Sequence, residues 1–206
     1  KTAYDPTSPY SASKAGSDHL VRAWNKTYNF PAIITNCSNN YGPYQFPEKL
    51  IPLTIIKLLR NEKIPIYGKG NQIRDWLHVE DHAEGIVKVM LKGKSGETYN
   101  IGGNNEISNL EVVKLICEIL KELNFNRKIL KNNNPETQIS FVKDRPAHDI
   151  RYAINTNKIN KKLNWNAKIK FKDGLRQTVI WYLENKKWWE KILIRDKNVI
   201  NRKGLN

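Results

Sequence analysis

The sequence is poor in cysteine and has no long apolar run. Only two cysteines occur in 206 residues, Cys37 and Cys117, and their spacing suits neither a disulfide framework nor a zinc site. No apolar run approaches the roughly 18 residues that a membrane span needs, and no signal-peptide pattern opens the chain. These absences predict a protein of the reducing cytoplasm, without a membrane partner and without a bound metal.

Blocks of like charge are also absent before the C-terminal end, although the net charge is +15. The lysines are spread along the chain, whereas a nucleic-acid-binding surface usually clusters its positive charge. We therefore expect no nucleic-acid partner. A basic surface still attracts an anionic small molecule such as a nucleotide diphosphate.

Apolar periodicity predicts an α/β chain. Helices are expected where apolar residues recur every three or four positions, and strands where they alternate or run together between turn residues. Ser108 and Glu111 form a capping-box pattern at the start of one helix. The expected helices cover residues 11–29, 48–60, 80–91, 109–123, 157–163 and 171–185, and the expected strands cover 32–37, 64–67, 73–79, 98–101 and 139–142. Residues 38–43 are expected to form a polar loop, and the basic residues after 186 a poorly defined tail.

The first expected helix carries a candidate catalytic pair, Tyr10 and Lys14. Residues four apart on a helix lie on the same face, one turn above the other. A lysine ammonium one turn from a phenol favours the phenolate, which can take a proton from an alcohol as a hydride leaves the carbon. The alternative is a surface Tyr and Lys on an ordinary helix, whose apolar face is expected at Ala12, Ala15, Leu20, Ala23, Trp24 and Tyr28.

Two further patterns have structural alternatives. His78 and His82 are four residues apart, but no third ligand follows at a useful spacing, so they are expected to orient and cap a strand-to-helix turn instead of binding metal. Arg74 and Asp75 are adjacent, as a surface ion pair of little energetic weight would be. Arg145 and Asp149 allow a similar structural interpretation.

Five segments occur in this order along the chain: Tyr10 to Lys14, residues 36–43, residues 46–52, residues 74–76 and residues 144–149. Together they closely resemble the C-terminal part of the dTDP-glucose 4,6-dehydratase family of extended short-chain dehydrogenases/reductases, over about residues 3–184. The string from Asn36 to Pro52, which contains two of these segments, is highly specific, whereas Tyr-x-x-x-Lys alone indicates only the superfamily.

This resemblance implies the end of an NAD-binding Rossmann fold joined to a smaller α/β domain that binds the nucleotide sugar. Residues 1–42 would close the Rossmann domain, with 76–103 returning to it. Residues 43–75 and 104–186 would form the sugar-nucleotide domain, and 187–206 a basic tail. The implied cofactor is NAD, the implied substrate is dTDP-glucose, and the implied assembly is a homodimer.

The resemblance also implies roles for individual residues. Tyr10 would be the base at the 4-hydroxyl of the sugar, and Lys14 would hold the ribose of the cofactor. Further cofactor contacts would come from Cys37, Ser38 and Asn40. Substrate contacts would come from Asn39, Lys49, Leu50, Pro65, Ile66, Tyr67, Arg74, Asn109, Asp144, Arg145, Pro146 and His148.

The family reaction oxidises C4 of the sugar with NAD, removes water across C5 and C6, and returns the hydride to C6. In the family an Asp-Glu pair upstream of the tyrosine supplies the acid and base of the middle step. This sequence shows neither that pair nor the Gly-rich strand-turn-helix that binds the pyrophosphate. We therefore expect a fragment of a longer enzyme that is inactive and prone to aggregate when alone.

Two other functions stay open at this point. One is a sister enzyme on the same scaffold, such as a UDP-sugar 4,6-dehydratase or a nucleotide-sugar epimerase. The other is a non-catalytic module that binds a nucleotide sugar or, because of its net charge, nucleic acid. Turnover of UDP-glucose against dTDP-glucose separates the first from the family reaction.

Overall fold

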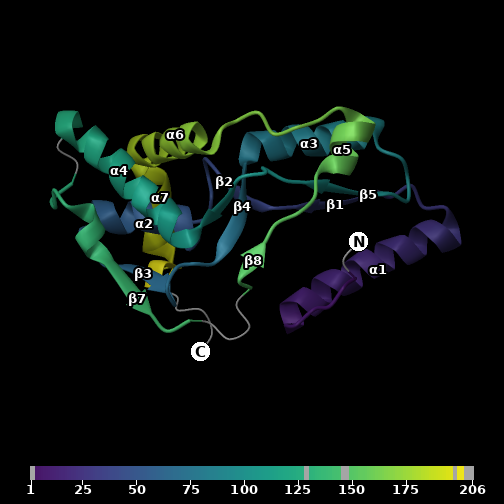
Figure 1. Cartoon of the computed structure of the whole chain (residues 1–206), viewed down its shortest axis with the longest axis horizontal. Helices are drawn as coiled ribbons and strands as arrows, with labels where there is room; N and C mark the ends of the chain where they lie inside the picture. Colours follow the sequence, from purple (N-terminus) through teal and green to yellow (C-terminus); the bar gives the residue numbers. More distant parts are fainter. Residues whose placement is uncertain (1–2, 128–129, 145–148, 197–198, 202–206) are drawn as a thin grey trace.

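The computed structural model describes residues 3–127, 130–144, 149–196 and 199–201. Helices and strands alternate along much of the chain (Figure 1), as expected for an α/β protein. They are α1 (Pro9–Tyr28), β1 (Ile34–Cys37), β2 (Asn39–Tyr41), α2 (Leu50–Leu59), β3 (Ile64–Tyr67), β4 (Ile73–His78), α3 (Val79–Lys92), β5 (Thr98–Ile101), β6 (Glu106–Ser108), α4 (Asn109–Arg127), the 3₁₀ helix η1 (Pro135–Gln138), β7 (Ile139–Val142), β8 (Arg151–Tyr152), α5 (Asn157–Leu163), α6 (Phe171–Glu184), α7 (Lys186–Arg195) and the 3₁₀ helix η2 (Val199–Asn201). Among the described residues, no helix is long and apolar enough to cross a membrane.

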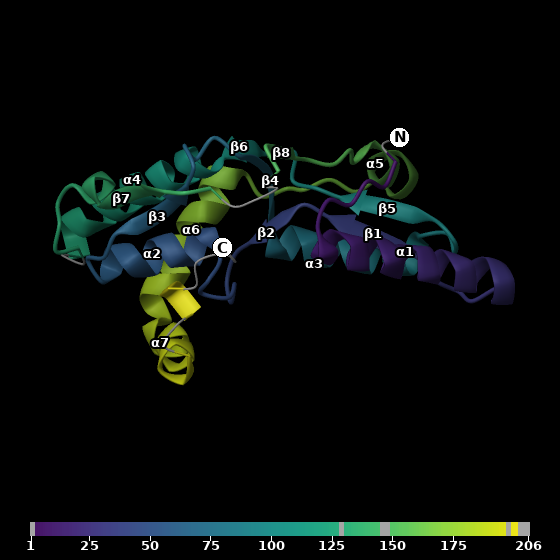
Figure 2. The same cartoon turned by 90° about the horizontal axis from the view of Figure 1, so that it is seen from below.

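The strands form three small sheets that follow one another along the molecule (Figures 1 and 2). At one end β1 pairs with β5 in parallel, and at the other β3 pairs with β7 in parallel. Between them, β4 pairs in parallel with β2 and β8 and antiparallel with β6. β4 is therefore the central strand of the structure.

Two hydrophobic cores lie on either side of this central strand. The larger contains Ile55 of α2, Ile116 of α4 and Val179 of α6, all fully buried. The smaller joins β5 and α3 to α5 and the segment that follows it. Its buried residues are Leu77, Val89, Tyr99, Ile101, Ile159, Leu163 and Trp165. α5 thus packs with the β1–β5 sheet, although the sequence-based division assigns residues 104–186 to the other domain; that division stays a prediction.

Helix α1 forms the N-terminal edge of the molecule and has almost no share in a core. The Ser8 side chain caps its first turn, and Asn29 ends it in the left-handed conformation. Ala15 is its buried residue, whereas Leu20, Trp24 and Tyr28 of the expected apolar face are 64%, 55% and 67% exposed. Polar contacts attach it instead, from the Arg22 guanidinium to Thr98 Oγ1 (3.4 Å) and from Asn25 Nδ2 to Ser95 Oγ (3.1 Å).

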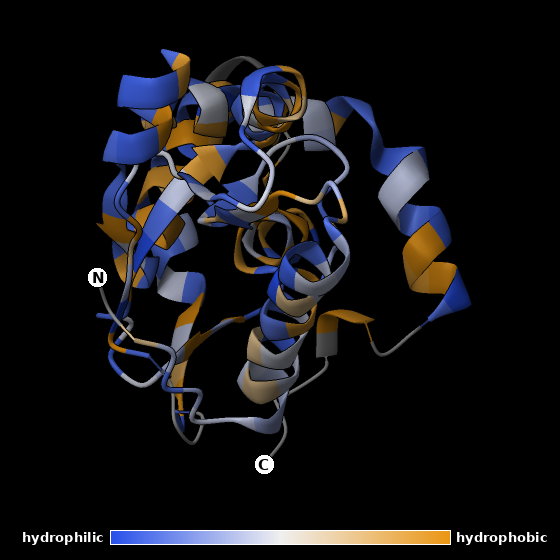
Figure 3. Ribbon diagram, turned by 90° about the vertical axis from the view of Figure 1, so that its right-hand side faces the viewer, coloured by the Kyte–Doolittle hydropathy of each residue, from blue (hydrophilic) through white to orange (hydrophobic). Residues whose placement is uncertain are grey.

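Two expectations from the sequence are wrong. Residues 39–41 of the expected polar loop form β2, because their backbone groups pair with β4. Residues 186–195 of the expected tail form α7, which docks through Trp189 (2% exposed), whose Nε1 donates to the Tyr182 carbonyl at 3.0 Å. Figure 3 shows α7 along one edge of the molecule, with an apolar turn just before its hydrophilic end. By contrast, the expected capping box is confirmed: Ser108 N donates to Glu111 Oε2 and Glu111 N to Ser108 Oγ.

The start of α3 uses two buried polar side chains. His78 is the N-cap, and its Nδ1 accepts from the backbone N–H of Glu80 at 3.3 Å, so its expected capping role is confirmed. Asp81, 3% exposed, accepts from the backbone N–H groups of Lys168 and Ile169 at 3.1 and 2.9 Å. Asp81 thereby ties the α5–α6 connection to α3.

Replacing Asp81 by Ala should destabilise the fold. The change leaves two backbone N–H groups without their acceptor, and each unsatisfied buried donor costs about 1–3 kcal/mol. We expect the free energy of unfolding in urea to fall by at least about 2 kcal/mol. The matched control is Glu80→Ala, which removes an exposed carboxylate from the same helical turn and should cost less than about 1 kcal/mol. Equal losses in the two variants would contradict this role of Asp81.

Acid should weaken the cap at His78. Burial lowers the pKa of His78, with Glu80 and Asp81 opposing the shift. A histidine whose pKa is lower in the folded state contributes stability above its unfolded pKa, near 6.5, and loses it as the pH falls through the folded value. Each such proton changes the free energy of unfolding by at most about 1.4 kcal/mol per pH unit.

The comparison is urea unfolding of the wild type and His78→Asn at pH 7 and pH 5. Asparagine keeps a capping oxygen and does not titrate, so the variant should lose less stability over this range. Burial also lowers the pKa of His82, and His82→Gln separates its share. An identical pH dependence in wild type and His78→Asn would refute the assignment.

Candidate active site

Tyr10 and Lys14 lie one turn apart near the start of α1. The Lys14 Nζ is 6.0 Å from the centroid of the Tyr10 ring. The phenol is 73% exposed and Lys14 is also exposed, so both groups are open to an incoming ligand. The structure therefore has the geometry that the spacing predicts, on the rim of the molecule.

Unpartnered polar atoms gather where β1 ends and β2 begins. Ser38, 3% exposed, donates its backbone N–H to the Ile101 carbonyl at 3.1 Å, and the Asn40 Nδ2 donates to the Ser38 carbonyl at 3.0 Å. The Ser38 Oγ and Asn40 Oδ1 are buried without a hydrogen-bond partner among the described residues. Buried polar atoms are normally paired, so these two atoms fit a ligand group at the carboxyl end of β1.

Tyr152 of β8 covers the same strand end. Its hydroxyl donates to the Cys37 carbonyl at 3.5 Å. Burial is the main reason why the pKa of Tyr152 is raised, and the carboxylates of Asp149 and Asp75 add to the effect. Tyr152 was not expected from the sequence, since a two-residue strand carries no recognisable pattern.

Asp75 is a buried structural carboxylate, so the interpretation of Arg74 and Asp75 as a surface ion pair is wrong. Asp75 is 1% exposed and accepts from the backbone N–H of Gly103 at 3.2 Å and of Asn105 at 2.8 Å. Arg74 instead donates to the carbonyls of Ile73 (2.7 Å) and Asp149 (2.9 Å). The physical reason is that consecutive residues of a strand point to opposite faces.

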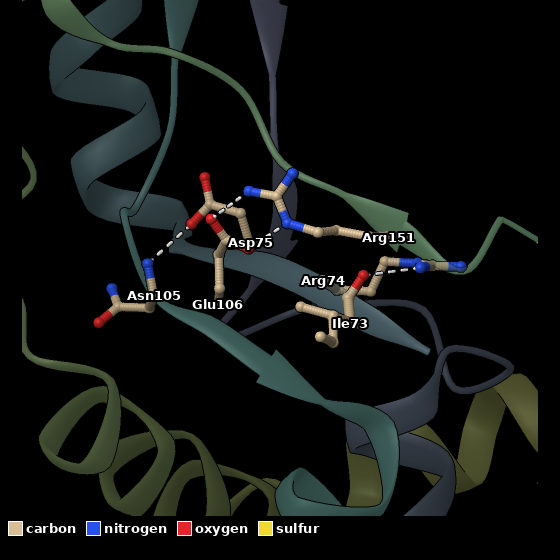
Figure 4. A network of polar contacts seen from close by, with 6 residues as sticks. All are labelled: Ile73, Arg74, Asp75, Asn105, Glu106 and Arg151. Atoms are coloured by element: carbon tan, nitrogen blue, oxygen red, sulfur yellow. Dashed lines mark hydrogen bonds and ion pairs between the residues drawn. The ribbon is translucent and has the colours of Figure 1, made fainter. Parts of the chain in front are cut away.

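A bidentate ion pair spans the central sheet beside them (Figure 4). The Arg151 Nε and Nη2 of β8 lie 2.6 and 2.7 Å from the two carboxylate oxygens of Glu106 on β6. The hydrogen bond from Arg151 is the main reason why the pKa of Glu106 is lowered. Because β4 lies between β6 and β8, this pair helps to hold β8 against the sheet.

A second group of expected site residues gathers around the sheet of β3 and β7. Pro65, Ile66 and Tyr67 belong to β3, where Tyr67 pairs with Val142 of β7. Asn109 is the first residue of α4, and Asp144 follows β7. These residues are far apart in the sequence, and the pairing of β3 with β7 together with the position of α4 brings them together. Gln72, which the sequence analysis did not single out, lies among them.

The remaining expected residues are placed as follows. Asn39 is in β2 and half-buried, while Lys49 and Leu50 lie at the start of α2. Lys49 Nζ forms an exposed ion pair with Glu48 at 3.0 Å. Arg145, Pro146 and His148 lie outside the described residues. Within the described ranges, no three His, Cys, Asp or Glu side chains are grouped as a metal site requires.

Comparison with known proteins assigns the chain to a family. The model of the family described as GDP-mannose 4,6 dehydratase matches residues 1–178. A dTDP-glucose 4,6-dehydratase of Shigella flexneri is 57% identical over 93% of this chain and 52% of its own length. One of Neisseria meningitidis serogroup B is 58% identical over 92% and 53%. The chain thus spans about half the length of the curated relatives it matches.

Solved structures that resemble this chain also include dTDP-glucose 4,6-dehydratases. A dTDP-glucose 4,6-dehydratase of Bacillus anthracis in complex with NAD superposes with a TM-score of 0.83 at 47% identity, over 93% of this chain and 57% of that one. One of Streptomyces venezuelae, with NAD and TYD bound, gives 0.83 at 42% identity, over 91% and 55%. A UDP-glucose 4-epimerase of Thermotoga maritima gives 0.77 at 23% identity, over 88% and 55%, which shows a shared fold alone.

Proposed function

Because this chain belongs to the GDP-mannose 4,6 dehydratase family, we propose that it takes part in the NAD-dependent 4,6-dehydration of dTDP-glucose, in which C4 is oxidised and water is lost across C5 and C6. The observation that carries the proposal is the 57% identity to a dTDP-glucose 4,6-dehydratase over 93% of the chain, together with Tyr10 and Lys14 one helical turn apart. The product would be dTDP-4-keto-6-deoxyglucose, and the enzyme would be a hydro-lyase. Conversion of UDP-glucose in preference to dTDP-glucose would overturn the substrate assignment.

The residues at the end of β1 fit the nicotinamide part of NAD. The buried Ser38 Oγ and Asn40 Oδ1 have no hydrogen-bond partner among the described residues and could bond a polar ligand group, and Cys37 presents its backbone beside them. Lys14 and Tyr10 would complete the cofactor contacts from α1. NAD would supply the hydride acceptor for C4 of the sugar and later the hydride donor for C6.

The proton chemistry would begin at Tyr10. Its oxygen would take the proton of the 4-hydroxyl as the hydride leaves C4, and the Lys14 ammonium would stabilise the phenolate. Exposure of both side chains leaves room for the sugar above α1. The loss of water across C5 and C6 needs another acid and base, and we assign no residue of this chain to that step.

The nucleotide part of the substrate would bind on the other side of β4. We propose that Tyr67, Asn109 and Asp144 line this part of the site, with Pro65, Ile66, Asn39, Lys49 and Leu50 around it. Arg74 would add a positive charge suited to a diphosphate. Residues 1–42 and 76–103 would then belong to the cofactor domain, and 43–75 and 104–186 to the substrate domain. A cytoplasmic location is part of this proposal.

We also propose that the enzyme is a homodimer. The support is the exposed apolar surface of α1, where Leu20, Trp24 and Tyr28 are each more than half exposed. Exposed apolar patches of this kind often mark protein interfaces.

Tyr10→Phe should remove the base while keeping the ring. In a preparation that converts dTDP-glucose, we expect the first hydride transfer to slow by about 10²–10⁴-fold, the range typical of a lost general base, with NAD binding unchanged. Lys14→Ala should weaken NAD binding as well, and Lys26→Ala, an exposed lysine at the other end of α1, serves as its control. The measurement is NADH absorbance in a single turnover. A wild-type rate in Tyr10→Phe would exclude Tyr10 as the base.

Arg74→Ala should weaken binding of the nucleotide sugar. Loss of a charge-assisted contact costs about 1.5–3 kcal/mol, so KM for dTDP-glucose should rise about 10- to 100-fold while the affinity for NAD stays the same. The control is Arg176→Ala, which removes an exposed arginine of α6 that is paired with Glu122 of α4. An unchanged KM in Arg74→Ala would show that Arg74 does not contact the substrate.

A further inference from the structure

Gln72 is a buried amide at the meeting point of three segments that carry predicted substrate residues. Its side chain is 4% exposed. The Nε2 donates to Asp144 Oδ2 at 2.7 Å and to the Tyr67 carbonyl at 3.4 Å. Its backbone carbonyl accepts from the N–H of Asn109 at 3.0 Å. One residue therefore joins the end of β3, the first turn of α4 and the segment that follows β7.

The turn next to Gln72 leaves these segments little freedom. Gly68 and Gly70 have φ values of 57° and 72°, which other residues adopt with strain. A Cβ on Gly68 would lie 2.8 Å from Asp144 Oδ2, and one on Gly70 would lie 2.9 Å from the Cβ of Leu110. The Gly70 carbonyl also accepts from Leu110 N at 2.9 Å. The turn is thus packed directly against both Asp144 and α4.

The hydrogen bonds fix the orientation of the Gln72 amide. Its nitrogen faces two oxygen acceptors, so exchanging the nitrogen and oxygen would bring three oxygens together. Its Oε1 is buried and has no hydrogen-bond partner in the described part of the chain. The hydrogen bond to the Asp144 carboxylate therefore sets the position of the Gln72 side chain.

We propose that Gln72 is a positioning residue of the nucleotide-sugar site, which acts by holding Asp144, Tyr67 and Asn109 in the arrangement that binding requires. This inference rests on the proposed function. It assigns Gln72 no contact with the reacting atoms: the amide orients the carboxylate of Asp144, and its backbone fixes the start of α4.

The test is calorimetric titration of dTDP into the 206-residue chain, which requires binding but no turnover. Gln72→Ala should raise the Kd for dTDP about tenfold. The matched control is Gln138→Ala. Gln138 is also buried (6% exposed), and its Nε2 also donates to a carbonyl, that of Glu62 at 2.8 Å, but it holds no predicted substrate residue. This control should lose thermal stability to a similar degree and keep the wild-type Kd.

A second variant separates positioning from folding. Gln72→Glu places a carboxylate against that of Asp144, and two carboxylates at this distance repel unless one is protonated. Binding of dTDP should therefore be weaker than in Gln72→Ala at pH 8 and should improve as the pH falls toward 5. In an Asp144→Asn background, the same Gln72→Glu change meets an amide, so it should weaken binding by a smaller factor than in the wild-type background.

The outcomes separate the proposed substrate from the proposed role of Gln72. If the wild-type chain unfolds cooperatively on heating, and is therefore folded, but binds no dTDP, the proposed substrate is wrong and the role of Gln72 falls with it. If the wild type binds dTDP but Gln72→Ala has the same Kd, or changes it no more than Gln138→Ala, the inference about Gln72 alone is overturned. Should Gln72→Ala fail to fold, equal effects of Gln72→Glu with and without Asp144→Asn would overturn it as well.

Discussion

The backbone pairing of β4 is the constraint on which the rest of the structure depends. Three other strands pair with it, and its consecutive residues point to opposite faces. Trp76 therefore enters the larger core and Leu77 the smaller one. A shift of one residue in the pairing would exchange these faces and remove Asp75 from the N–H groups of Gly103 and Asn105. The pairing register of this six-residue strand therefore decides which of its side chains enter each core.

The two parts of the proposed site depend on this strand in different ways. The end of β1 is connected to β4 through β2 and through Tyr152 of β8, which reaches the Cys37 carbonyl. The group around Tyr67 and Asp144 is connected to it through Gln72, one residue before β4 begins. Exposed ion pairs contribute little stability, but the two-point contact of Arg151 with Glu106 restricts where β8 can lie.

Helix α1 depends on local interactions for its own geometry and on only a few long-range contacts for its position. Its internal geometry is local, since Ser8 caps it and Lys14 lies over the Tyr10 ring by helical spacing alone. Its position depends on a few polar contacts, such as those of Arg22 and Asn25, because only Ala15 is buried. A partner that covers Leu20, Trp24 and Tyr28 would add apolar support to the helix that carries the proposed catalytic pair.

The sequence by itself determined the features that depend on residues close together in the chain. Local spacing was enough to place Lys14 over the Tyr10 ring, to predict the capping box of Ser108 and Glu111, and to predict most element boundaries, because the 3.6-residue period of helices and the two-residue period of strands act locally. The resemblance of its motifs to dTDP-glucose 4,6-dehydratases was confirmed by the curated relative that is 57% identical over 93% of the chain and by the family model that matches residues 1–178.

Only the tertiary structure decided the long-range pairings. Residues 39–41 form a strand because their backbone pairs with β4. Helix α7 docks because the buried Trp189 side chain donates a hydrogen bond to the Tyr182 carbonyl. Neither partner can be read from the local pattern. The same holds for Asp75 and Gln72: each polar side chain gains its role from backbone or side-chain groups that lie about 30 or 70 residues away along the chain, and burial makes those hydrogen bonds costly to lose.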